Sequence, residues 1–189
     1  MPADEIEVQL TNLAGLNRAS RYAVFGTHAN GAADELYLRL GLVDEQIRDW
    51  AAVLWSEGRA QFDGGRSEVV PELGTFMPLV APDAARASGL VFLDVVADDP
   101  EIRRHTSFIA RRLIEALSDE QRPRPFLNRS LLDQRDAPER IEKLQLIYLL
   151  TKYDGNRSAV ARHLSLHRDT LYHRLAKHNL SGFGRPQGA

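Results

Sequence analysis

The chain has 189 residues, of which 43% are hydrophobic and 26% are charged, as is ordinary for a soluble globular protein. It contains no cysteine, which excludes disulfides, thiolate metal sites and cysteine nucleophiles. No run of about 18 apolar residues predicts a transmembrane helix, and the acidic first residues do not resemble a secretory signal. These features predict a cytoplasmic protein with no membrane partner.

The net charge of −2 hides an asymmetry along the chain. Residues 137–189 contain 9 Lys and Arg against 4 Asp and Glu, a net charge of +5, so the rest of the chain carries −7. The same segment holds four of the six histidines. A basic segment joined to an acidic one predicts two domains with different functions.

The first part of the acidic segment shows mainly helical patterns. A loose helical pattern covers residues 6–17, and residues 21–25 favour a short strand. Over residues 33–55 apolar side chains recur at intervals of three and four, which predicts helix, and Gly41 divides it into two. Gly58 is placed to end the second helix as its C-cap.

The next stretch favours strands. Residues 61–63 look extended, and two apolar strands are expected over 74–80 and 89–96. Because proline cannot donate to a sheet ladder, Pro78 indicates an edge position or a bulge. A helix from 98 to 117 should close the domain.

This order of elements predicts a small α+β domain over residues 1–117, with an antiparallel sheet and helices. Residues 118–136 are rich in proline, charged and polar residues, and they predict an inter-domain linker. Residues 137–189 predict a separate all-α domain. Its three helices are expected over 138–152, over 157–164, and from 167 or 168 to about 178.

Two features of the last domain are typical of a helix-turn-helix. Asn156 is a good N-cap for the second helix, and the small Ala161 stands where two helices would cross closely. Five aliphatic residues supply an apolar seam: Val160, Leu164, Leu166, Leu171 and Leu175. The first helix has an apolar face wide enough to pack against the second and third helices and also against a second subunit.

The third helix presents a surface of hydrogen-bond donors and cations. Its members are Arg168, Thr170, Tyr172, His173, Arg174 and Lys177. This composition suits a helix that enters the major groove of DNA, where phosphates flank the base edges.

At these residues the chain resembles the Fis-type helix-turn-helix, the module that also ends the NtrC-type enhancer-binding activators. The resemblance rests on Gly155-Asn156-Arg157-Ser158, on Ala161 and on the run from Leu166 to Leu175, and it covers about residues 138–180. It implies a homodimer whose two recognition helices meet adjacent major grooves of bent double-stranded DNA. One departure is Ser165, which stands at the turn position usually held by glycine.

The same resemblance implies the residues that contact DNA. Asn156, Arg157 and Ser158 would touch phosphates, and four residues would lie in or beside the groove: His167, Arg168, Thr170 and Arg174. The complete expected set is Asn156, Arg157, Ser158, His167, Arg168, Thr170, Tyr172, His173, Arg174 and Lys177.

The acidic segment resembles a GAF-type sensor domain over residues 50–117, in its order of helix, strands and closing helix. The resemblance implies a domain that senses a ligand, binds a partner or dimerises. The sequence lacks the Gly-x-x-x-x-Gly-Lys-Ser/Thr motif of the AAA+ ATPase that enhancer-binding activators carry, so remodelling of polymerase by ATP hydrolysis is not expected.

No pattern predicts an enzyme, a metal site or a cofactor. The four C-terminal histidines are not spaced to lie on one helix face, whereas zinc needs three or four convergent ligands. Two function hypotheses follow. The first is a bacterial transcription regulator that binds DNA sequence-specifically as a homodimer. The second is a protein-interaction module that docks on a larger regulator, its C-terminal helices serving for dimerisation. The target DNA sequence, and activation or repression, stay open.

Overall fold

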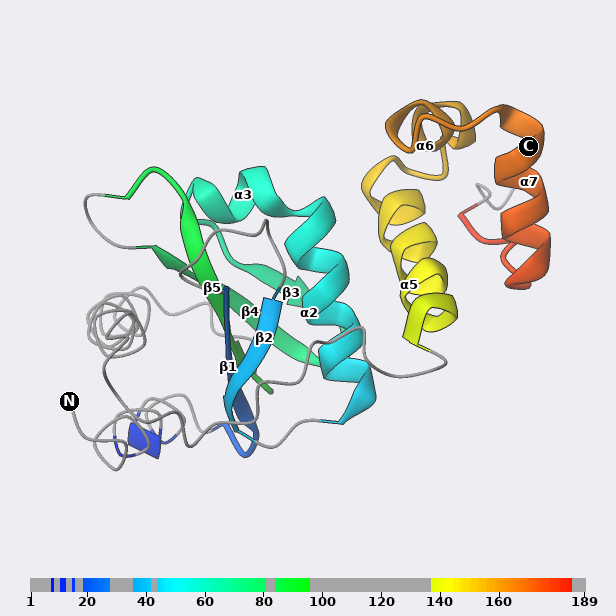
Figure 1. Cartoon of the computed structure of the whole chain (residues 1–189). Coiled ribbons are helices and arrows are strands. Elements are labelled where there is room, and N and C mark those ends of the chain that lie inside the picture. Colours follow the sequence, from blue (N-terminus) through cyan, green and yellow to red (C-terminus); the bar gives the residue numbers. More distant parts are fainter. Residues whose placement is uncertain are drawn as a thin grey trace. The chain divides into compact units, whose positions relative to one another are not determined.

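The computed structural model describes residues 19–27, 36–41, 44–80, 84–95 and 137–184, together with Val8, Thr11, Asn12 and Gly15. The chain divides into an N-terminal unit, Met1–Asp133, and a C-terminal unit, Gln134–Ala189 (Figure 1). In the part of the chain described, no helix is long and apolar enough to cross a membrane.

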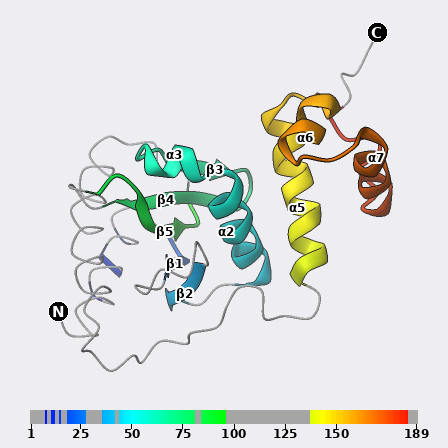
Figure 2. The same ribbon diagram turned by 45° about the horizontal axis from the view of Figure 1, so that its top comes forward.

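The N-terminal unit contains a five-stranded antiparallel sheet in the order β2-β1-β5-β4-β3. Its strands are β1 (Tyr22–Thr27), β2 (Leu36–Gly41), β3 (Glu68–Val70), β4 (Gly74–Val80) and β5 (Ala87–Leu93). Helices α2 (Glu45–Glu57) and α3 (Arg59–Asp63) lie on the same side of the sheet in Figure 1 and Figure 2. The expected small antiparallel sheet with helices is therefore confirmed.

Residues 36–41 correct one prediction, because they form strand β2 and not the first of two helices. Leucine at every second position, 36, 38 and 40, fits the two-residue period of a strand as well as the helical pattern. Pairing with β1 decides between the two, since it gives these backbone groups partners along the whole segment. The second expected helix is α2, and Gly58 is its C-cap as predicted.

Residues 61–63 correct a second prediction, because they belong to the short helix α3 and are not extended. Arg59 and Asp63 form an ion pair of 3.1 Å across one helical turn. Phe62, in the same turn, is buried in the core. Glycines at 58 and 64 flank the helix and limit it to five residues.

Strand β4 confirms the prediction made from Pro78. β3 pairs with β4 only as far as Phe76, so at Pro78 the strand has one hydrogen-bonded neighbour, β5. The missing N–H of proline therefore costs no hydrogen bond to β3. The register with β5 also shifts between Leu79 and Val80, where a bulge lies.

The core of the N-terminal unit fills the space between the helices and the sheet. Its largest fully buried side chains are Phe25, Phe62, Phe76, Phe92, Ile47, Leu54, Leu79, Leu90 and Leu93. The rings of Phe76 and Phe92 lie 4.9 Å apart on neighbouring strands. Of the other expected elements, the helix at 98–117 and the linker at 118–136 lie outside the described residues, and the four described positions between 6 and 17 are helical.

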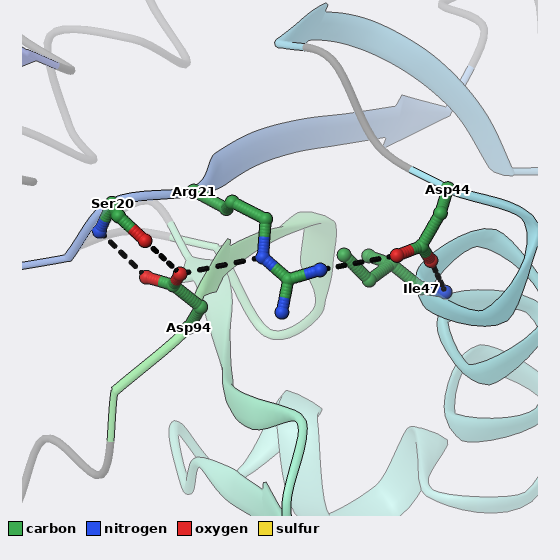
Figure 3. A network of polar contacts seen from close by, with 5 residues as sticks. All are labelled: Ser20, Arg21, Asp44, Ile47 and Asp94. Carbon is green, nitrogen blue, oxygen red and sulfur yellow. Dashed lines mark hydrogen bonds and ion pairs between the residues drawn. The ribbon is translucent and has the colours of Figure 1, made fainter.

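Asp94, directly after β5, joins three segments of the N-terminal unit (Figure 3). Its carboxylate accepts hydrogen bonds from the Ser20 amide at 2.8 Å and from the Ser20 hydroxyl at 2.6 Å. The Arg21 guanidinium lies between two acids, with Nε 3.3 Å from Asp94 and Nη1 3.1 Å from Asp44. Asp44 in turn accepts from the Ile47 amide as the N-cap of α2. The start of β1, the end of β5 and the start of α2 are thus held together.

The C-terminal unit is a three-helix domain, as predicted. Its helices are α5 (Ala137–Lys152), α6 (Arg157–His163) and α7 (Arg168–Lys177). Eight buried residues form the core: Leu146, Leu149, Leu150, Val160, Ala161, Leu171, Leu175 and Leu180. Leu164 packs against this core from its edge. The small Ala161 is buried between α6 and α7, as the helix-turn-helix pattern requires.

The turn between α6 and α7 is closed by a residue in the left-handed conformation. Ser165 has a φ of 53°, and its position lets the Leu166 amide donate to the Ala161 carbonyl at 2.8 Å. Glycine adopts this conformation without the steric clash of a Cβ atom. Ser165 therefore places a small backbone strain in the turn that orients α7.

We expect Asp94→Asn to destabilise the N-terminal unit by about 1–3 kcal/mol, because hydrogen bonds to a charged acceptor are lost. Burial raises the pKa of Asp94, but hydrogen bonds from Arg21 and Ser20 outweigh it, and the net pKa is lowered. This stabilisation is therefore complete above about pH 4 and is lost as the pH falls through the lower pKa of the folded state.

Urea unfolding followed by tryptophan fluorescence measures this effect in the whole chain, since both tryptophans lie in α2. The exposed Glu72→Gln is the matched control and should leave the midpoint unchanged. If the difference in free energy of unfolding between wild type and Asp94→Asn stays constant from pH 7 to pH 3, the charge of Asp94 is not the source of the stabilisation.

We expect Ser165→Gly to stabilise the C-terminal unit by up to about 1 kcal/mol, because it removes the left-handed strain. Hydrogen–deuterium exchange of peptides from α6 and α7 measures the local free energy of opening. Ser165→Ala keeps the strain and should give no gain. Equal protection in the glycine and alanine variants would show that the strain is negligible.

Candidate nucleic-acid interface

Asn156 fixes the start of α6. Its side-chain oxygen accepts from the Ala159 amide at 3.1 Å, so the predicted N-cap is confirmed. Just before it, Asp154 and Gly155 have φ values of 48° and 75° and reverse the chain after α5. A Cβ atom at residue 155 would collide with the Gly184 backbone, so this turn requires glycine.

The N-terminal half of α7 forms an exposed polar face. His167 is the N-cap, with its Nδ1 accepting from the Asp169 amide at 3.4 Å. Arg168, Thr170 and His173 are all exposed, whereas Leu171 and Leu175 are fully buried on the other side of the helix. The structure thus leaves four of the predicted DNA contacts accessible to solvent: His167, Arg168, Thr170 and His173.

Tyr172 holds two arginines from different helices. The Arg168 guanidinium donates to the Tyr172 hydroxyl at 3.3 Å, and its carbon lies 5.6 Å from the ring centre. The guanidinium carbon of Arg157, at the start of α6, lies 5.2 Å from the same ring. Arg157 also donates to the Ser181 carbonyl. Hydrogen bonding to Arg168, and then to Arg157, lowers the pKa of Tyr172.

This arrangement places two positive charges within 5.6 Å of the centre of one aromatic ring. Cation–π contact and the shared hydroxyl limit how far both guanidinium groups move. Ser158 is exposed beside Arg157 on the first turn of α6. The starts of α6 and α7 therefore present an ordered pair of cations, suited to anionic oxygens such as phosphates.

Glu142 on α5 gathers the cations at the other end of α7. Its carboxylate lies 3.2 Å from Arg174 Nη1, 3.3 Å from Lys177 Nζ and 2.8 Å from His178 Nε2. The hydrogen bond from His178 is the main reason that the pKa of Glu142 is lowered, with Lys177 and Arg174 adding to it. Lys177 is also 3.1 Å from Glu139.

Glu142 thus divides the ten predicted residues into two groups. Arg174 and Lys177 are held against α5, with side chains 39% and 50% exposed. The rest lie at the start of α6 and in the first two turns of α7: Asn156, Arg157, Ser158, His167, Arg168, Thr170, Tyr172 and His173. The role of Glu142 was missed from the sequence, because it acts on residues more than thirty positions away and no local pattern marks it.

A metal site is not formed by any group of His, Asp or Glu in the described part of the chain. His163 instead lies 3.0 Å from the Tyr153 hydroxyl, and His178 pairs with Glu142. Both histidines thus have neighbours that account for their positions without a metal.

Comparison with known proteins identifies the C-terminal unit. Residues 137–178 match the family described as "Bacterial regulatory protein, Fis family". No curated protein and no solved structure matches the chain. The match begins at the first residue of α5 and ends just after α7, so it spans all three helices. Residues 137–178 are therefore a Fis-family helix-turn-helix, a DNA-binding regulatory module.

Proposed function

We propose that this protein is a transcription regulator that binds double-stranded DNA sequence-specifically as a homodimer. The observation that carries the proposal is the accessible polar face of α7 within a Fis-family helix-turn-helix. In such motifs the recognition helix lies in the major groove and its N-terminal residues contact base edges. The exposed residues at the start of α7 have the donors that this role needs.

The proposed base contacts come from the first two turns of α7. Arg168 offers a planar fork of donors, which pairs with the O6 and N7 acceptors of guanine. Thr170 offers a hydroxyl, and His173 lies at the centre of the outward face, between the buried Leu171 and Leu175. His167 accepts the cap hydrogen bond at Nδ1, so in its neutral form Nε2 carries the proton and can donate to DNA.

The proposed phosphate contacts come from the start of α6. The cap uses the side-chain oxygen of Asn156, which leaves its amide group as a donor. Arg157 and the Ser158 hydroxyl lie next to it. Tyr172 acts mainly by ordering Arg157 and Arg168, whose guanidinium groups approach its ring.

Arg174 and Lys177 are proposed to contact phosphates at the edge of the groove. Both side chains are partly exposed while they pair with Glu142. A guanidinium has five N–H donors, so Arg174 can keep its ion pair and still donate to a phosphate. Glu142 would then fix the direction in which these cations point.

The homodimer is proposed to form through the side of α5 that faces away from α6 and α7. Ile141 and Leu144 are half-buried and lie outside the core that covers α6 and α7. Both are large apolar side chains, which gain free energy when a second copy removes them from water. A dimer would place two copies of α7 to read two half-sites of DNA.

The N-terminal unit is proposed to dimerise, to bind a protein partner or to sense a ligand. The antiparallel sheet with α2 and α3 fits the small α+β architecture that the resemblance to a GAF-type domain implies. Phenylalanine and leucine side chains fill the space between this sheet and its helices. This favours a role in contacts with a second copy or a partner.

We expect Arg168→Ala to weaken specific DNA binding by about 1–3 kcal/mol, because it removes a bidentate base contact. The measurement is the affinity for a duplex selected by the wild-type chain from a random pool, over a range of salt concentrations. The exposed Arg66→Ala removes the same charge from the N-terminal unit and is the matched control.

Wild-type affinity should fall steeply with salt, since several phosphates are contacted. The alternative function, a module that docks on a larger regulator, predicts negligible DNA binding by both wild type and variant. A flat salt response and no selected sequence would therefore favour that alternative.

We expect Leu144→Glu to convert the dimer to a monomer, because a charge cannot be buried in an apolar contact without a partner. Sedimentation of the full chain measures the change. Lys143→Glu, at the neighbouring exposed position, introduces the same acid on α5 and should leave the dimer intact. If the Leu144→Glu variant is still a dimer, the interface lies on another surface of the chain.

A further inference from the structure

The outward face of α7 contains an acid, Asp169, that the proposed DNA contacts do not use. It is the second residue of the helix, and its side chain is 80% exposed. It precedes Leu171 by two residues and Leu175 by six, so the helical period places it away from the core. His173 follows one turn later on the same side. The carboxylate therefore lies on the surface that is proposed to enter the groove.

The neighbouring cations leave this carboxylate exposed to solvent. Arg168 turns to Tyr172, where its Nη2 lies 3.3 Å from the hydroxyl. The His167 Nδ1 is 3.4 Å from the Asp169 carboxylate, but the same nitrogen accepts the hydrogen bond from the Asp169 amide. A ring nitrogen that accepts a hydrogen bond carries no proton to donate. While His167 caps the helix, its Nδ1 therefore donates no hydrogen bond to the Asp169 carboxylate, which stays exposed on the outward face.

An exposed carboxylate lowers affinity for DNA in general, because phosphates line both sides of the groove. It is favourable only where a base presents an amino donor. In the major groove, guanine presents the O6 and N7 acceptors and thymine presents O4, and both repel a carboxylate. Adenine has an amino group, but its N7 acceptor lies beside it. Cytosine presents the N4 amino group and has no acceptor of its own on the major-groove edge.

We propose that Asp169 is a specificity-determining residue that selects cytosine at one position of each half-site. The inference rests on the proposed function, since it needs α7 to lie in the major groove. An acid in the first turn also interacts favourably with the helix dipole. The dipole effect stabilises α7 equally for every DNA sequence. A change in base preference therefore distinguishes recognition of a base from the dipole effect.

The test is selection of bound duplexes from a random pool by the full chain and by three variants. Asp169→Ala removes the acceptor, and Asp169→Asn replaces it with an amide that pairs with the N6 and N7 atoms of adenine. Asp154→Asn is the control. It removes the same charge from an exposed position of the same unit, outside α7, at a φ of 48° that asparagine tolerates.

Wild type and Asp154→Asn should both enrich cytosine at one position of each half-site. In Asp169→Ala the preference for cytosine at that position should fall by about tenfold, while the base preferences at the other positions should stay the same. Asp169→Asn should move the preference at that position to adenine. Thermal unfolding of each variant shows whether stability has changed.

Two results would overturn the inference while leaving the proposed function in place. One is a wild-type site whose base preferences are unchanged in Asp169→Ala. The other is a preference that Asp169→Ala removes but that is for a base other than cytosine. If wild type enriches no sequence at all, the proposed function fails, and the inference fails with it.

Discussion

The carboxylate of Glu142 holds the last turn of α7 against α5. It lies between α5 and the last turn of α7, only 23% exposed, and contacts Arg174, Lys177 and His178. Charge-assisted hydrogen bonds are stronger than neutral ones, and partial burial limits their screening by water. The apolar core fixes the distance between the helices, while Glu142 also fixes the rotation of α7 about its own axis. The direction of the polar face follows from that rotation.

The helix-turn-helix could be predicted from the sequence because its determinants are local. The Asn156 cap, the small Ala161 and the spacing of the leucines each act within a few residues. Glu142 could not be predicted in this way, since its partners lie more than thirty residues further along the chain. Likewise, Leu36–Gly41 became a strand through pairing with β1, which outweighed a helical pattern.

The two units each use an acid to join segments that are distant in sequence. In the N-terminal unit Asp94 and Arg21 connect the end of β5 to the start of β1 and, through Asp44, to α2. These contacts strengthen the β1–β5 pairing, which brings the two ends of the described sheet region together. A sequence pattern shows which residues are apolar, but it does not show which acid will meet which cation.

The difference between local and distant contacts has a kinetic consequence. The helices of the C-terminal unit are joined by short turns, so the contacts that define it have low contact order and should form rapidly. The sheet of the N-terminal unit cannot close until β1 finds β5, a slower event because a long loop must be ordered first. We therefore expect the C-terminal unit to fold before the N-terminal unit during refolding.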